Sequence, residues 1–197
     1  MPRRSCGIWH FVDDGEDGEI GVILYHFSED PTIARFVPRS MATRPGETPR
    51  VWAIDAAHAP IYFLPRDCPR VCFWALPTTT PEDRAYFLGH TVASMVIAIE
   101  SAWLDRVRAT RLYGYHLPGD TFVEDDDEQG GPGYFVSYTP VTPVRVEPVG
   151  DLLTRLIGAG VELRLTPSLW PLHRALVPAT LHFSMIRMRN ARPESAG

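Results

Sequence analysis

The side chain best suited to chemistry in this sequence is His26, near the end of the apolar segment Leu24–Phe27 and ahead of a Glu-Asp-Pro turn. Imidazole is both a near-neutral acid or base and a compact hydrogen-bonding group. A strand that ends at a loop is a place where a fold presents such a ring to a ligand. Strand alternation also puts His26 on the same face as Leu24, as in a core histidine bonded to backbone. The spacing alone favours this structural role over a ligand-orienting one.

A second candidate is Glu162, a carboxylate inside the otherwise apolar segment Val161–Leu165. In a strand, Glu162 and Arg164 point the same way and can pair across a solvated face. In a cleft, the same carboxylate would stabilise a positive charge or accept a proton. The pattern favours the ion pair.

Arginines gather in two separate stretches of the chain. Arg66 and Arg70 bracket Asp67, and Arg187 and Arg189 lie near the C-terminus. Guanidinium groups bind phosphate or carboxylate through two parallel hydrogen bonds, so a converging pair would suit an anionic ligand. The same groups can instead tie loops down through Asp67 and nearby carbonyl groups.

Composition indicates a globular protein, with 45% hydrophobic and 22% charged residues. The net charge of −5 argues against general affinity for nucleic acid or an anionic membrane surface. All 19 basic residues are arginine, which excludes Schiff-base and P-loop lysine chemistry. Cys6, Cys68 and Cys72 form no CxxC pair and predict free thiols in a reducing compartment rather than a metal site. Without a signal peptide or a membrane-spanning run, a cytoplasmic protein is expected.

Runs of β-branched and aromatic residues predict short strands separated by helices. A hydroxyl cap at Thr80, followed by proline and two acidic residues, predicts a helix start. That helix could run to Arg108 or end near Gly89, and the β-branched residues of 96–99 favour a strand after the earlier end. The acidic run Glu124–Glu128 predicts a solvated loop tip. The strands are expected at 20–27, 51–54, 70–76, 95–99, 111–117, 161–165 and 180–188, and further helices at 55–63, 100–109, 151–157 and 169–176. The segment 134–149 has strand-like composition, but Pro140, Pro143 and Pro148 break it and place it at an edge or bend it round a corner.

These elements predict an α+β fold of short mixed or antiparallel strands with interspersed helices. We expect one compact domain over residues 20–197, preceded by a flexible leader over residues 1–19, whose acidic and glycine residues cannot form a core.

Three stretches of the sequence resemble an uncharacterised bacterial domain family that has no assigned activity. They are LYHFSEDP (Leu24–Pro31), PRDCPRV (Pro65–Val71) and FSMIRMRNA (Phe183–Ala191). The resemblance covers nearly everything from Ile20 onward, and it implies no function.

Other segments resemble small bacterial ADP-ribosyltransferases of the rifampin-modifying type. Tyr25–Ser28 is similar to their aromatic-His-Gly-Thr strand, whose histidine binds NAD, and Val51–Asp55 is similar to a strand that carries an NAD-stacking tyrosine. Leu112–Asp127, Ser137-Tyr138 and Pro143–Val146 are similar to later segments in order and spacing. The resemblance implies an ADP-ribosyltransferase-like fold, NAD as the cofactor and a small-molecule or nucleotide ligand.

The resemblance also implies roles for single residues. His26 would hydrogen-bond the ribose of NAD, with Ser28 in place of the threonine of the motif, and Trp52 would stack on the nicotinamide ring. Phe27 departs from the glycine of the motif and crowds the space of the ribose. Trp52 departs from the tyrosine and offers no hydroxyl group.

Two alternatives remain for the catalytic acid and two for the pyrophosphate. Glu162 or Asp125 would stabilise the positive charge that develops as nicotinamide departs, and Arg66 or Arg70 would hold the pyrophosphate. The protein acceptor is unknown.

Two further functions fit the same sequence. One is a non-catalytic binding or interaction domain on a degenerate version of this scaffold. The other is an enzyme acting on a phosphorylated small molecule, which would require at least two of Arg66, Arg70, Arg164 and Arg187 to converge.

Overall fold

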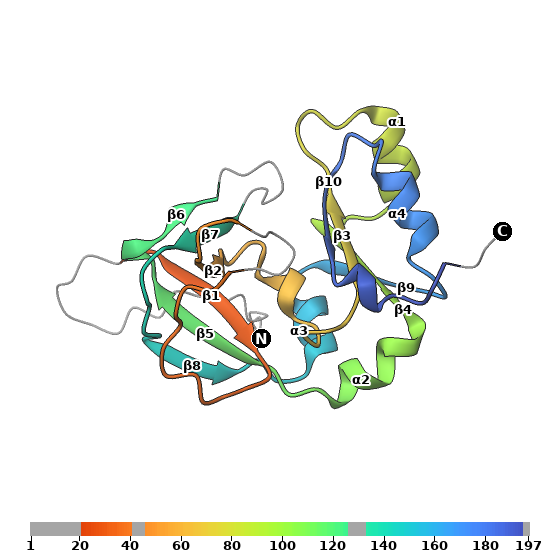
Figure 1. The fold of residues 1–197 in the computed structure, drawn as a ribbon. Helices are drawn as coiled ribbons and strands as arrows, with labels where there is room; N and C mark the ends of the chain where they lie inside the picture. Colours follow the sequence, from red (N-terminus) through yellow and green to blue (C-terminus); the bar gives the residue numbers. More distant parts are fainter. Residues whose placement is uncertain (1–20, 41–45, 126–132, 195–197) are drawn as a thin grey trace, which may run out of the picture. The chain divides into compact units, whose positions relative to one another are not determined.

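The computed structural model describes residues 21–40, 46–125 and 133–194. The chain divides into two compact units, each built from two chain segments and each containing one β-sheet (Figure 1). Unit 1 combines the described residues up to Pro60 with Arg111–Gly150, and unit 2 combines Ile61–Thr110 with the residues from Asp151 onward. The predicted leader, residues 1–19, lies outside the described residues.

Unit 1 contains a six-stranded antiparallel sheet in the order β6-β7-β2-β1-β5-β8. The central pair, β1 and β5, joins residues about ninety positions apart, with His26 opposite Tyr115 and Tyr25 opposite His116. The strands are β1 (Ile23–Ser28), β2 (Val51–Ile54), β5 (Tyr113–Pro118), β6 (Val123–Glu124), β7 (Tyr134–Ser137) and β8 (Arg145–Pro148), and a 3-10 turn, η4 (Gly119–Thr121), follows β5.

Strand alternation gives the sheet of unit 1 two different faces. The first face is apolar and packs beneath Phe36 and Val141, which come from loops; its core members are Leu24, Val51, Ala53, Tyr115 and Leu117. The register places His26 on this first face. Tyr25, Trp52 and His116 lie on the second face, which carries most of the polar contacts described below.

Unit 2 contains a four-stranded sheet in the order β10-β3-β4-β9, in which β4 and β9 are parallel and the other pairs antiparallel. The strands are β3 (Arg70–Trp74), β4 (Met95–Glu100), β9 (Val161–Thr166) and β10 (His182–Ile186). The helices are α1 (Pro81–Asp83), α2 (Leu104–Ala109), α3 (Leu152–Gly158) and α4 (Trp170–Leu176). The 3-10 turns are η1 (Ala59–Tyr62), where the chain passes between units, η3 (Ser101–Trp103) and η5 (Met188–Asn190). A π-helical segment, η2 (Arg84–Leu88), continues α1.

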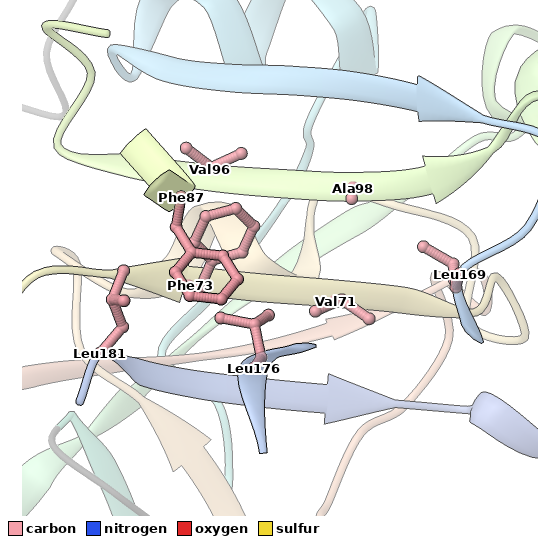
Figure 2. Close-up of a cluster of buried hydrophobic side chains, with 8 residues drawn as sticks. All are labelled: Val71, Phe73, Phe87, Val96, Ala98, Leu169, Leu176 and Leu181. Atoms are coloured by element: carbon pink, nitrogen blue, oxygen red, sulfur yellow. The ribbon is translucent and has the colours of Figure 1, made fainter. Parts of the chain in front are cut away.

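One face of the unit 2 sheet is covered by a hydrophobic cluster (Figure 2). Strands β3 and β4 supply its floor, and η2, α4 and their flanking residues supply the cover. The rings of Phe73 and Phe87 meet edge to face, with centroids 6.2 Å apart. The members of the cluster are Val71, Phe73, Phe87, Val96, Ala98, Leu169, Leu176 and Leu181.

The α+β class predicted from the sequence is confirmed, and so are most of its elements. The helix that begins after Thr80 ends at Gly89, and strand β4 follows, as the β-branched residues indicated. Thr80 Oγ1 caps this helix by accepting from the Asp83 N–H. The helix predicted over 55–63 was too long, because Pro60 restricts it to a 3-10 turn. Within the described residues no helix is both long enough and apolar enough to cross a bilayer.

Cys68 and Cys72 are buried free thiols in unit 2, as predicted. Burial raises the pKa of each thiol to about 12. We therefore expect neither to react with a disulfide reagent at pH 8 in the native state, because the thiolate is the reactive form. The measurement uses a Cys6→Ser variant, so that the two buried thiols alone are counted. Two thiols should react after denaturation, and rapid labelling of either one in the folded protein would contradict the burial.

Candidate functional site

His26 is tied to the neighbouring strand of its sheet by a hydrogen bond. Its Nδ1 lies 2.9 Å from the carbonyl oxygen of Trp52, and its ring packs against Phe36 with centroids 4.7 Å apart. A carbonyl oxygen only accepts, so Nδ1 carries the proton of the neutral ring and Nε2 is its acceptor nitrogen. The bond to backbone is the one expected of a structural histidine, and it couples His26 to the strand that carries Trp52.

Ser28 ends strand β1 and shapes the turn that follows. It is buried, and its Oγ accepts from the Asp30 N–H at 3.1 Å. The Tyr115 hydroxyl donates to the Asp30 carbonyl at 2.6 Å and accepts from the Ile33 N–H at 3.1 Å. The hydroxyl of Ser28 thus serves the turn after β1.

Trp52 lies on the opposite face of the sheet from His26, beside the planar guanidinium group of Arg50 and two carboxylates. The guanidinium carbon of Arg50 is 5.5 Å from the centroid of the Trp52 ring and 5.8 Å from that of Tyr138. Arg50 also pairs with Asp125, at 3.4 Å, and with Glu47, at 3.1 Å. We call Glu47, Arg50, Trp52, Asp125 and Tyr138 the Arg50 cage.

The prediction that the acidic run forms a solvated loop tip is wrong for Asp125, which is only 7% exposed. Strand β6 pairs with β7, and the Asp125 N–H extends this ladder by donating to the Tyr134 carbonyl at 2.8 Å. Its carboxylate is held by Arg50. Glu124 is exposed as predicted, and residues 126–132 lie outside the described part of the chain.

Glu162 forms the ion pair that its spacing predicted. Its Oε1 accepts from Arg164 Nε at 2.7 Å, and Arg164 also donates to the Phe87 carbonyl at 2.8 Å. Hydrogen bonds from Thr91 and then from Arg164 hold the pKa of Glu162 below its usual value. Glu162 is therefore an ionised, paired carboxylate on β9.

The candidate residues fall into two groups. His26, Ser28, Trp52 and Asp125 belong to unit 1, whereas Arg66, Arg70 and Glu162 belong to unit 2. Within unit 1, Trp52 and Asp125 are brought together through Arg50, and His26 contacts the Trp52 backbone rather than its ring. Within unit 2, Arg66 and Arg70 lie close to Arg187, and Arg164 is held at Glu162.

A polar cluster on the second face of the unit 1 sheet was not predicted from the sequence. His116 Nε2 lies 3.1 Å from Glu147 Oε1, and Arg145 lies 2.6 Å from the other oxygen of Glu147. The Tyr25 ring meets the His116 ring edge to face at 5.0 Å. Burial, and then the charge of Glu147, raise the pKa of Tyr25 against an opposing effect of Arg145. The two-residue spacing of Arg145 and Glu147 on one strand could have indicated their ion pair.

A second missed pair follows strand β2. Asp55 Oδ1 accepts from both the backbone N–H and the ring Nδ1 of His58, each at 2.8 Å. Burial alone would raise the pKa of Asp55, but hydrogen bonds from His58 and Ala57 and the charge of His58 outweigh it and lower the pKa. The three-residue spacing of Asp55 and His58 was the signal. No group of three His, Cys, Asp or Glu side chains suited to a metal ion occurs among the described residues.

Comparison with known proteins identifies the family of the chain. Residues 25–191 match the model of a family of unknown function, DUF6886. The chain belongs to this family. Membership in DUF6886 confirms the resemblance to an uncharacterised domain family. The matched region covers most of both units. No curated protein and no solved structure matches this DUF6886 chain.

Proposed function

We propose that this chain is an ADP-ribosyltransferase-like protein that binds oxidised NAD through the Arg50 cage. One observation carries the proposal: the cage surrounds a flat cation with two aromatic rings and two carboxylates. Aromatic faces and carboxylates together favour a positive charge. The nicotinamide ring of oxidised NAD is also flat and positively charged, so it can take the place that the Arg50 side chain fills in the resting protein.

The proposal gives Trp52 and His26 different tasks. Trp52 supplies the surface on which nicotinamide stacks. His26 acts as a positioning residue for Trp52. Its ring lies on the other face of the sheet and holds strand β2 through the hydrogen bond to the Trp52 carbonyl. Loss of the His26 ring should therefore weaken binding less than loss of the Trp52 ring.

For group transfer, the proposal assigns the acid to Asp125 rather than to Glu162. When the bond between ribose C1′ and nicotinamide breaks, nicotinamide leaves with the bonding electron pair and positive charge develops at C1′. The Asp125 carboxylate, which already faces a cation in the cage, would stabilise that charge. A nucleophile of an acceptor protein would then bond to C1′ and lose its proton.

A second candidate function is NAD binding without transfer. Two observations favour it. Asp125 forms an ion pair with Arg50, and His26 is bonded to the Trp52 carbonyl, so the Asp125 carboxylate and the His26 ring both have structural roles. The two candidates share the ligand and differ only in turnover.

Calorimetric titration with oxidised and reduced NAD tests the cage. We expect oxidised NAD to bind at least about tenfold more tightly than reduced NAD, because the reduced ring is neutral. Trp52→Leu should weaken the binding of oxidised NAD about tenfold, a cost of about 1.4 kcal/mol. Trp103→Leu is the matched control, since Trp103 in unit 2 also faces an arginine, Arg106, at 5.2 Å.

The outcomes separate the candidates. Equal affinity for the two forms of NAD, or equal losses in the two tryptophan variants, would exclude the cage as the nicotinamide site. Release of nicotinamide by the native chain that disappears in Asp125→Asn would support cleavage of the bond to C1′, the first step of transfer. Tight binding with no release, even with candidate acceptor proteins present, would support binding alone.

A further inference from the structure

Four arginines form a positively charged cluster in unit 2, although the chain as a whole carries a net charge of −5. Arg66 lies in the turn before β3, and Arg70 is the first residue of that strand. Arg187 follows β10, and Arg189 lies in η5. We call Arg66, Arg70, Arg187 and Arg189 the arginine cluster.

Backbone pairing and two hydrogen bonds hold these distant segments together. Strands β3 and β10 are neighbours, with Arg70 opposite Ile186. Arg187 Nε donates to the Arg66 carbonyl at 3.3 Å, and Asn190 Nδ2 donates to the Asp67 carbonyl at 2.8 Å. The cluster is therefore built by tertiary structure from residues about 120 positions apart.

The charges of the cluster act on Arg187. Burial, and then the charges of Arg189, Arg66 and Arg70, lower the pKa of Arg187, while Asp67 opposes them from 3.9 Å. Asp67 is about half exposed, so solvent screens its contribution. Positive charges that act on one another in this way favour the binding of an anion.

Arg70 is the buried member of the cluster, only 2% exposed. Its Nη1 donates to the carbonyls of Pro65 and Cys68, at 3.2 and 3.1 Å, which fixes the path of the turn. Its buried Nε has no hydrogen-bond acceptor among the described residues. A buried charge of this kind is unfavourable unless a negative charge compensates it.

The backbone at Arg187 is also unusual. With φ 57° and ψ 29°, it is in the left-handed region, and it is the non-glycine residue with positive φ in the described part of the chain. Glycine would adopt this conformation without strain. An arginine persists there only because the surrounding structure holds it, which is typical of positions whose side chain is needed.

We propose that the arginine cluster is a binding site for a phosphate-bearing small molecule. Arg66, Arg187 and Arg189 donate to the phosphate oxygens, and Arg70 acts as the positioning residue that shapes the turn and adds a positive charge. Guanidinium forks match the geometry of phosphate. The site rests on unit 2 alone and does not depend on the Arg50 cage.

Thermal unfolding with inorganic phosphate tests the site, with sodium chloride at equal ionic strength as the reference. A ligand that binds only the folded chain raises the midpoint with its concentration. We expect a saturable rise with phosphate, and at least about a tenfold weaker apparent affinity in Arg187→Gln. Arg189→Gln should weaken binding in the same direction, and because Arg189 is exposed, this change leaves the turn intact.

The matched control is Arg108→Gln, which removes the same charge from an exposed position on α2. Its phosphate response should equal that of the native chain. The absence of a saturable response, or equal losses in Arg108→Gln and the two cluster variants, would overturn the site. A response that persists in Trp52→Leu separates this proposal from the proposed NAD binding. Tighter binding of pyrophosphate or ADP-ribose than of phosphate would identify a nucleotide, and equal affinities a monophosphate.

Discussion

Replacing Phe73 with alanine is expected to lower the free energy of unfolding by about 3–5 kcal/mol. Phe73 is fully buried at the centre of the unit 2 cluster, where its ring meets the edge of Phe87 (Figure 2). Its ring also lies 5.5 Å from the guanidinium carbon of Arg164. Truncation removes apolar area, an aromatic pair and a cation–π contact, and it leaves a cavity that the flanking strands can close only in part.

Urea denaturation followed by circular dichroism would measure this loss. Phe73→Leu keeps most of the apolar volume and should cost less than half as much. Val92→Ala is the surface control, because Val92 is fully exposed, and it should change stability by no more than about 0.5 kcal/mol. A loss below about 1.5 kcal/mol in Phe73→Ala would mean that the cluster is not close-packed.

Local patterns predicted the elements of this fold well, because strand composition and helix caps are properties of neighbouring residues. The run 96–99 is rich in β-branched residues and forms the interior of β4. The pairing of Glu162 with Arg164 followed from their two-residue spacing on one strand. His26 bonds to backbone, as its place beside Leu24 indicated.

Long-range pairing could not be predicted in the same way. The division into two units depends on β1 pairing with β5, and nothing in Ile23–Ser28 identifies a partner some ninety residues away. The same limit applies to Asp125, since its burial follows from the β6–β7 ladder rather than from its acidic neighbours.

The candidate site was predicted only in part for the same reason. Trp52 and Asp125 were identified as separate residues, but Arg50, which joins them, was not. An arginine in a Pro-rich loop has no local feature that marks it as the centre of an aromatic and acidic cage. Arg66 and Arg70 were recognised as possible anion ligands, and the contact of Arg66 with Arg187 required the β3–β10 pairing.

A large loss of stability is also expected when Gly133 is replaced by a residue with a Cβ. Gly133 has φ +88°, and its carbonyl accepts from the Asp55 N–H at 3.0 Å. A Cβ at this position would overlap the imidazole ring of His58, which Asp55 holds in place. Gly133→Ala should therefore lower the free energy of unfolding by about 2–4 kcal/mol, about 1–2 of it from the left-handed backbone and the rest from displacement of His58.

A matched glycine and a double-mutant cycle divide this effect into its two causes. Gly150 has φ +83° but open space around its would-be Cβ, so Gly150→Ala should show only the backbone cost. In a His58→Ala background the ring is absent, and Gly133→Ala should then cost about as much as Gly150→Ala. Additive losses of Gly133→Ala and His58→Ala in urea denaturation would show that the ring and the glycine do not meet. A coupling of about 1–2 kcal/mol would show that the Asp55–His58 pair is fixed by the close approach of this glycine.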